Sequence, residues 1–129
     1  MDEHDTGLVA IVDDDGSLRR SLGNLLGSAG FRVAAFASAE EFLTSATRGT
    51  PGCLVLDLRL GGMSGLDLLG HLAATSSRVP VVILTAHGDD RARQRALQAG
   101  ARAFLSKPVR GEVLLDTVRG ALRRGDAGH

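Results

Sequence analysis

The hydrophobic positions of the chain alternate between short, nearly continuous runs and longer stretches with helical spacing. The short runs predict strands, and they cover residues 8–12, 31–36, 53–56, 81–84 and 103–105. Arg32 interrupts the second run, which places that strand near a sheet edge. The other runs are apolar enough to be buried on both faces, as in a parallel sheet covered by helices.

The stretches between the strands carry apolar residues at intervals of three and four, the spacing of a buried helix stripe. The first stripe consists of Leu18, Leu22, Leu25, Leu26 and Ala29. Gly30 follows it as a C-terminal cap. Further helices are expected after Ser38, Ser64, Asp89 and Pro108, and Ser38 with Glu41 forms a capping-box pattern. The helix after Asp89 is expected to bury Ala92, Ala96 and Leu97.

Strand and helix alternate through the whole chain, which predicts a single α/β domain with the flavodoxin-like (βα)5 fold. We expect a parallel five-stranded sheet of order 2-1-3-4-5 with right-handed crossovers and helices on both faces. The domain is predicted to cover residues 8–124, between an N-terminal tail at 1–7 and a C-terminal tail or linker start at 125–129.

Composition narrows the class of protein. Lys and Arg total 15, as do Asp and Glu, and aromatic residues make up only 3% of the 129 residues. A balanced charge with so few stacking side chains argues against direct contact with nucleic acid. No apolar run approaches the roughly 20 residues of a membrane span, and the acidic start is unlike a secretory signal. A cytoplasmic protein is therefore expected, with the lone Cys53 reduced and buried.

Polar residues stand where the predicted strands end. Asp13 and Asp14 follow the first strand, Asp57 the third, Thr85 ends the fourth, and Lys107 follows the fifth. In the order 2-1-3-4-5 these four strands are neighbours, so the side chains should meet at one rim of the sheet. A single aspartate here is equally well explained as a turn or helix-capping residue, which is our interpretation of Asp15 and Asp89. That explanation does not account for the whole set.

Clustered carboxylates need a positive partner, because two like charges about 4 Å apart cost roughly 4 kcal/mol at an effective dielectric constant of 20. Lys107 is one candidate and a divalent cation is another. A site with oxygen donors and neither Cys nor His favours Mg²⁺ over Zn²⁺. A carboxylate is also a competent nucleophile for phosphoryl transfer and yields an acyl phosphate.

Five separated segments resemble the receiver (CheY-like) domains of bacterial two-component response regulators. They are residues 9–15, 54–60, 62–65, 82–89 and 104–108, and the last residues of the second and fourth segments are similar to the FixJ-like branch. The resemblance implies that Asp57 accepts a phosphoryl group from the phosphohistidine of a cognate histidine kinase. Asp13, Asp14, Asp57 and the backbone carbonyl of Arg59 would hold Mg²⁺.

The same resemblance assigns roles to other residues. Thr85 would donate a hydrogen bond to the phosphoryl group, and Lys107 would pair with Asp57 at rest and with the phosphoryl group afterwards. Thr85 and Phe104 would form the switch, while Arg59 and His87 would tune the lifetime of the acyl phosphate. The face made by the fourth helix, fifth strand and fifth helix would signal to an output domain, a partner or a second copy. Such a domain promotes only its own phosphorylation and dephosphorylation.

One departure and three alternatives complete the sequence interpretation. Gly61 stands where the family usually has proline, and a degenerate receiver that acts by contact alone is the first alternative. A phosphatase of the haloacid-dehalogenase type needs Asp-x-Asp, whereas Arg59 is the second residue after Asp57. Nucleotide binding is disfavoured because residues 61–65 lack a Walker lysine and the dinucleotide spacing.

Overall fold

The computed structural model describes residues 7–45, 51–75, 78–86 and 88–127. Within these residues, strands and helices alternate strictly along the chain. The strands are β1 (Leu8–Val12), β2 (Arg32–Phe36), β3 (Cys53–Leu56), β4 (Val81–Thr85) and β5 (Ala103–Ser106). The helices are α1 (Gly16–Ser28), α2 (Ala39–Ser45), α3 (Gly65–Ala74), α4 (Asp90–Gln98) and α5 (Gly111–Ala127).

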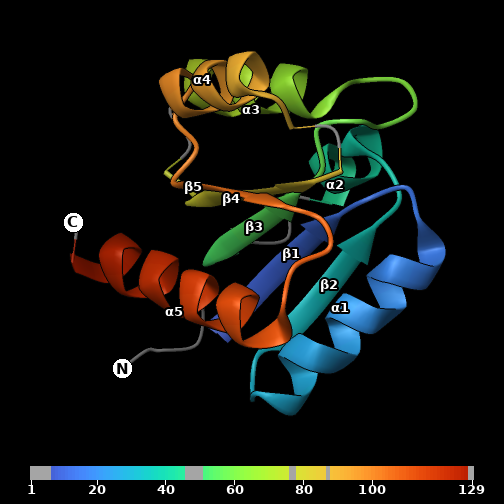
Figure 1. The fold of residues 1–129 in the computed structure, drawn as a ribbon, viewed down its shortest axis with the longest axis vertical. Coiled ribbons are helices and arrows are strands. Elements are labelled where there is room, and N and C mark those ends of the chain that lie inside the picture. The colour runs from blue at the N-terminus through green and yellow to red at the C-terminus, as the bar shows by residue number, and fades with distance from the viewer. Residues whose placement is uncertain (1–6, 46–50, 76–77, 87, 128–129) are drawn as a thin grey trace.

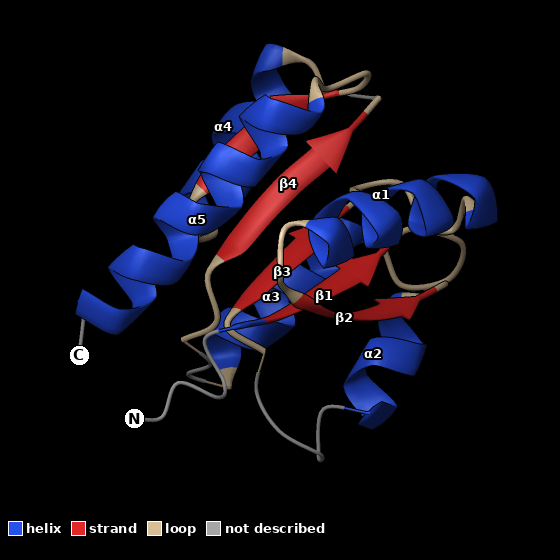
Figure 2. Cartoon of the chain, turned by 90° about the horizontal axis from the view of Figure 1, so that it is seen from below, coloured by secondary structure: helices blue, strands red, loops and turns tan. Residues whose placement is uncertain are grey.

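All strand pairs are parallel, and the sheet order is β2-β1-β3-β4-β5. Helices α1 and α5 cover one face of the sheet, and α2, α3 and α4 cover the other (Figures 1 and 2). The predicted fold class, strand order and two-sided helical cover are confirmed. With this order β1 and β3 lie side by side in the sheet, so the residues that follow them meet at one edge.

Strands β1 and β3 are apolar throughout because successive residues enter two different cores. In β3, Leu54 and Leu56 pack toward α2, α3 and α4, whereas Cys53 and Val55 pack toward α1 and α5. All four of these side chains are buried. The edge strand β2 is less buried and exposes Arg32, as its interrupted pattern predicts.

Helix caps occur at the edge of the sheet where the strands end. The Asp15 carboxylate accepts hydrogen bonds from Ser17 N and Leu18 N at the start of α1. Ser64 forms a capping box with Asp67 at the start of α3. Asp89 caps α4 by accepting from Ala92 N at 2.8 Å. The capping roles expected of Asp15 and Asp89 are confirmed.

One detail differs from the sequence pattern. Leu97 was expected on the buried stripe of α4, but its side chain is 36% exposed, and Ala96 is the buried residue of that helix. Helix α5 extends from Gly111 to Ala127, and the domain limits at residues 8 and 124 stay a prediction. Within the described part of the chain, no helix is both long and apolar enough to cross a membrane.

Candidate phosphoacceptor and metal site

Two buried carboxylates lie side by side at the carboxyl ends of β1 and β3. Asp13 and Asp57 are only 2% and 5% exposed. Their main chains extend the sheet by one residue, because Asp57 N donates to Val12 O at 3.0 Å and Asp13 N donates to Phe36 O at 3.1 Å. Burying ionised carboxylates is costly unless they gain charged or hydrogen-bonded partners.

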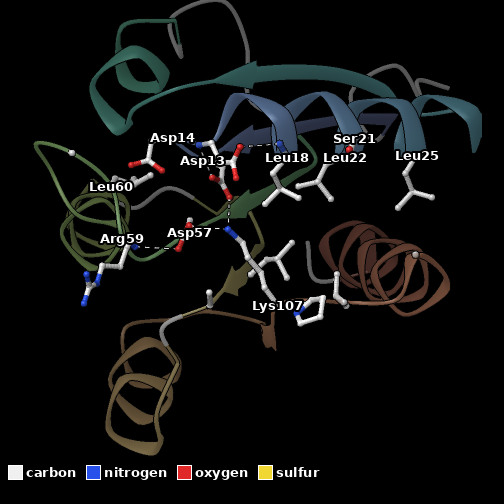
Figure 3. A pocket seen from close by; sticks show the side chains of 17 residues that line it. Asp13, Asp14, Leu18, Ser21, Leu22, Leu25, Asp57, Arg59, Leu60 and Lys107 are labelled. Atoms are coloured by element: carbon white, nitrogen blue, oxygen red, sulfur yellow. Dashed lines mark hydrogen bonds and ion pairs between the residues drawn. The ribbon is translucent and has the colours of Figure 1, made fainter.

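Lys107 is the partner of both carboxylates. Its Nζ donates to Asp13 Oδ2 at 2.8 Å and to Asp57 Oδ2 at 3.0 Å (Figure 3). Burial by itself lowers the pKa of Lys107, but the hydrogen bonds and charges of the two carboxylates outweigh it, so the net pKa is raised. The lysine is placed by the sheet, since its backbone N donates to Thr85 O at 2.9 Å, and its peptide bond to Pro108 is cis.

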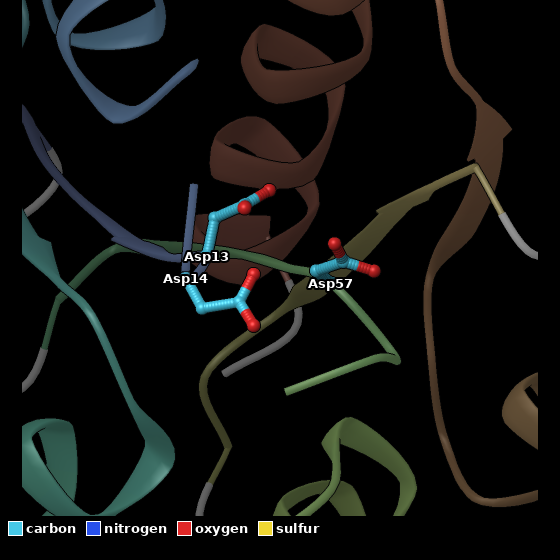
Figure 4. A group of neighbouring side chains, drawn as sticks. All are labelled: Asp13, Asp14 and Asp57. Carbon is cyan, nitrogen blue, oxygen red and sulfur yellow. The ribbon is translucent and has the colours of Figure 1, made fainter. Parts of the chain in front are cut away.

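Asp14 adds a third, exposed carboxylate to this group (Figure 4). One carboxylate oxygen from each of Asp13, Asp14 and Asp57 lies within 4.8 Å of the others. Lys107 supplies one positive charge to three negative ones. The donor set consists of hard oxygen atoms, and one of its members faces solvent, which fits a hydrated Mg²⁺ ion.

Arg59 approaches the site through its main chain. Arg59 N donates to Asp57 Oδ1 at 3.1 Å. The guanidinium group points away from Asp57, and the side chain is exposed (Figure 3). The contact that Arg59 makes with the acidic group is therefore made by its backbone N–H, and the role predicted for its carbonyl oxygen stays a prediction.

The family model for the response regulator receiver domain matches residues 9–119. The chain belongs to this family. The predicted resemblance, including its FixJ-like character, is confirmed.

The similar proteins include regulators longer than this chain. Nodulation protein W of Bradyrhizobium diazoefficiens is 48% identical over 117 residues, which cover 91% of this chain and 52% of that protein. The structure of full-length FixJ from B. japonicum matches with a TM-score of 0.86 at 38% identity, and the match covers 92% of this chain and 59% of that one. The structure of FixJ-N matches with a TM-score of 0.84 at 36% identity, and the match covers 95% of this chain and 96% of that one. The receiver domain thus spans about half the length of the curated relatives it matches.

The expected switch residues lie on the neighbouring strands β4 and β5. Thr85 ends β4 and is fully buried, while its neighbours Leu84 and Ala86 line the cleft next to the carboxylates. Phe104 lies on β5, is half-buried and packs against the core under α4. His87, expected to influence the lifetime of the phosphoryl group, lies outside the described residues.

Two features of the site were not predicted from the sequence. Arg19 Nη1 donates to the carbonyl oxygen of Asp13 at 2.7 Å, and its position one turn into a helix gave no signal of this. The second is a cleft of about 980 Å³ that runs from the carboxylates between α1 and the segment after β5. Leu18, Leu22 and Leu25 point into it (Figure 3), so the stripe expected to be buried also forms a cleft wall.

Proposed function

We propose that Asp57 of this receiver domain accepts a phosphoryl group from the phosphohistidine of a cognate histidine kinase in the cytoplasm. A carboxylate oxygen of Asp57 bonds to phosphorus while the bond between phosphorus and the imidazole nitrogen breaks. The electron pair of that bond stays on the imidazole. The observation that supports this best is a buried Asp57 carboxylate that shares a lysine ammonium group with Asp13 and lies close to the carboxylate of Asp14.

A magnesium ion is part of the proposal. Asp13, Asp14 and Asp57 would hold it, because their carboxylates present hard oxygen ligands at one edge of the sheet. The backbone carbonyl of Arg59 would be the fourth ligand. When bound, the ion supplies positive charge that neutralises the phosphoryl oxygens. In receiver domains generally the acidic cluster serves this purpose, and the donor set here fits it.

Lys107 and Thr85 would complete the phosphoryl site. Lys107 holds the resting carboxylates of Asp13 and Asp57 by bonds of 2.8 and 3.0 Å, and its ammonium group can pass to a phosphoryl oxygen once Asp57 is phosphorylated. The Thr85 hydroxyl would donate a hydrogen bond to another oxygen. Catalysis of phosphoryl transfer is largely positioning and charge stabilisation, and these groups provide both.

Signalling would follow from the charge added to the site, about −1.5 to −2. Movement of Thr85 toward the phosphoryl group would free Phe104 to change rotamer and reshape the face of α4, β5 and α5. That face would contact an output domain, a partner or a second copy. The domain, taken as residues 8–124, would promote its own phosphorylation and dephosphorylation only, with Arg59 and His87 setting the lifetime.

Intact-mass spectrometry tests the proposal. The protein is incubated with Mg²⁺ and acetyl phosphate, alongside Asp57→Asn and a sample with EDTA. We expect one added phosphoryl mass in the wild type, and none in the variant or with EDTA. If a folded wild type gains no phosphoryl mass while a control receiver does, the proposal is wrong and the contact-only alternative takes its place.

A further inference from the structure

The loop between β3 and α3 carries the Arg59 carbonyl and is anchored at both ends. At one end, Arg59 N donates to Asp57 Oδ1 at 3.1 Å. At the other, Gly65 N donates to Leu58 O at 3.0 Å, beside the capping box of α3. Between these anchors lie two exposed glycines, Gly61 and Gly62, which have no side chains to hold the loop in place.

A side chain from another element ties the middle of this loop. Glu40, in the first turn of α2, accepts a hydrogen bond from Met63 N with its Oε2 atom at 2.8 Å. Met63 lies 23 residues after Glu40 in the sequence, and its loop runs beside α2 (Figure 1). The hydrogen bond from Met63 lowers the pKa of the Glu40 carboxyl, as expected for an acceptor that binds best when ionised.

The Glu40 carboxylate lies close to the backbone of Gly62. Its φ angle is 77°, in the left-handed region that favours glycine. A Cβ atom at Gly62 would come within 2.8 Å of the same Glu40 Oε2 atom. Glycine therefore satisfies two demands at once, the turn of the loop and the close approach of Glu40.

We propose that Glu40 is a positioning residue for the metal site. Its hydrogen bond to Met63 N restrains the β3–α3 loop and thereby keeps the Arg59 carbonyl in a position to bind Mg²⁺. The inference rests on the proposed function, because Arg59 matters only if the acidic group binds the ion. Groups that orient a metal ligand from outside the coordination sphere affect affinity even though they never touch the metal.

The chain offers a matched control in the next residue. Glu41 lies in the same first turn of α2, carries the same charge and is also exposed. Its Oε1 accepts from Ala37 N at 3.0 Å, a contact local to the start of α2. Replacing Glu41 therefore removes an acidic cap of the helix without touching the loop, and separates helix stability from loop position.

The test compares Glu40→Ala, Glu40→Gln and Glu41→Ala with the wild type as full chains labelled with ¹⁵N. Hydrogen exchange at the Met63 amide reports the hydrogen bond to Glu40, and an NMR titration with Mg²⁺ reports the metal affinity. We expect Glu40→Ala to accelerate Met63 exchange and to raise the Mg²⁺ dissociation constant about three- to tenfold. This is less than is usual for buried ligand-orienting groups, because Glu40 is exposed.

Rescue distinguishes positioning from a general loss of stability. The Gln side chain keeps an acceptor oxygen, so in Glu40→Gln the Met63 exchange rate and the Mg²⁺ dissociation constant should lie close to the wild-type values. Glu41→Ala should leave both quantities at wild-type values. Glu40→Ala that matches Glu41→Ala in exchange and in Mg²⁺ affinity would overturn the inference. A wild type that binds no Mg²⁺ would instead overturn the proposed function, and the role of Glu40 with it.

Discussion

The ring of Phe104 lies directly against the backbone of Gly88, so closely that a Cβ atom at Gly88 would come within 2.5 Å of ring atom Cε1. The same Cβ would lie 3.4 Å from the Thr85 methyl group. The absence of a side chain at residue 88 therefore makes room for the ring in its resting position. The loop after β4, the residue that ends β4 and the aromatic ring on β5 meet at one point.

Gly88→Ala should drive the Phe104 ring out of this position without phosphorylation. Because the ring must move to admit a methyl group, we expect new Phe104 side-chain resonances in NMR spectra and a stability loss of about 1–3 kcal/mol. Gly70→Ala in α3 is the control, since nothing lies within 4 Å of its Cβ position. Unchanged Phe104 resonances in Gly88→Ala would show that the ring is not held by this contact.

Lys107→Met should destabilise the resting domain, because it leaves the buried Asp13 and Asp57 carboxylates without their cation. The expected loss is about 2–4 kcal/mol by urea denaturation, and Mg²⁺ should recover part of it. Arg110→Ala removes the exposed ion pair with Glu112 and should cost less than about 0.5 kcal/mol. Equal losses from the two substitutions would mean that burial does not amplify the Lys107 contacts.

Removal of Asp14 should separate metal binding from folding. Asp14 is exposed and belongs to the carboxylate group, so Asp14→Ala should leave the metal-free stability near the wild-type value or raise it by relieving repulsion. Mg²⁺ at about 100 times its dissociation constant should stabilise the wild type by about 2.7 kcal/mol and the variant by much less. Thermal melts with and without EDTA measure both quantities.

Asp15→Ala is the control for that comparison. It should cost about 1 kcal/mol through loss of the α1 cap, yet keep the full stabilisation by Mg²⁺. Full stabilisation of Asp14→Ala by Mg²⁺, or loss of that stabilisation in Asp15→Ala, would contradict the role of Asp14 as a metal ligand.

Cys53 should be inert in the folded protein. Its side chain is fully buried, and burial raises the pKa of the thiol to about 12. Between its ordinary value of 9.0 and that value, the unfolded chain loses the proton and the folded chain keeps it, so stability should fall as pH rises above 9. A thiol reagent should label native protein at pH 8 only as fast as it unfolds, and rapid labelling without urea would contradict the buried position.

The alternating pattern was sufficient to predict the fold, because each strand enters two cores and each helix buries one stripe. It was also sufficient to bring Asp13, Asp14, Asp57 and Lys107 to one edge, since strand order and strand ends determine where the residues after them lie. The pattern was less reliable at Leu97, because a residue at the margin of an apolar stripe can lie on either side of the boundary with solvent.

Contacts between distant backbone and side-chain atoms could not be predicted from the sequence. The bond from Met63 N to Glu40 and the bond from Arg19 to the Asp13 carbonyl depend on how α2, the β3–α3 loop and α1 are placed in space. No periodicity or motif encodes them. Gly61, in place of the family's usual proline, makes the β3–α3 loop more permissive, and the structure adds the Glu40 contact that the sequence did not reveal.

Mapping the phosphoryl group to a residue tests the central claim most directly. After reaction with acetyl phosphate and Mg²⁺, borohydride reduces an aspartyl phosphate to homoserine, which peptide mass spectrometry locates in the sequence. The account predicts homoserine at position 57, none in Asp57→Asn, and a marked reduction in Asp14→Ala. Modification at Asp13 or Asp14 instead, or at no aspartate in a protein that has gained the phosphoryl mass, would contradict it.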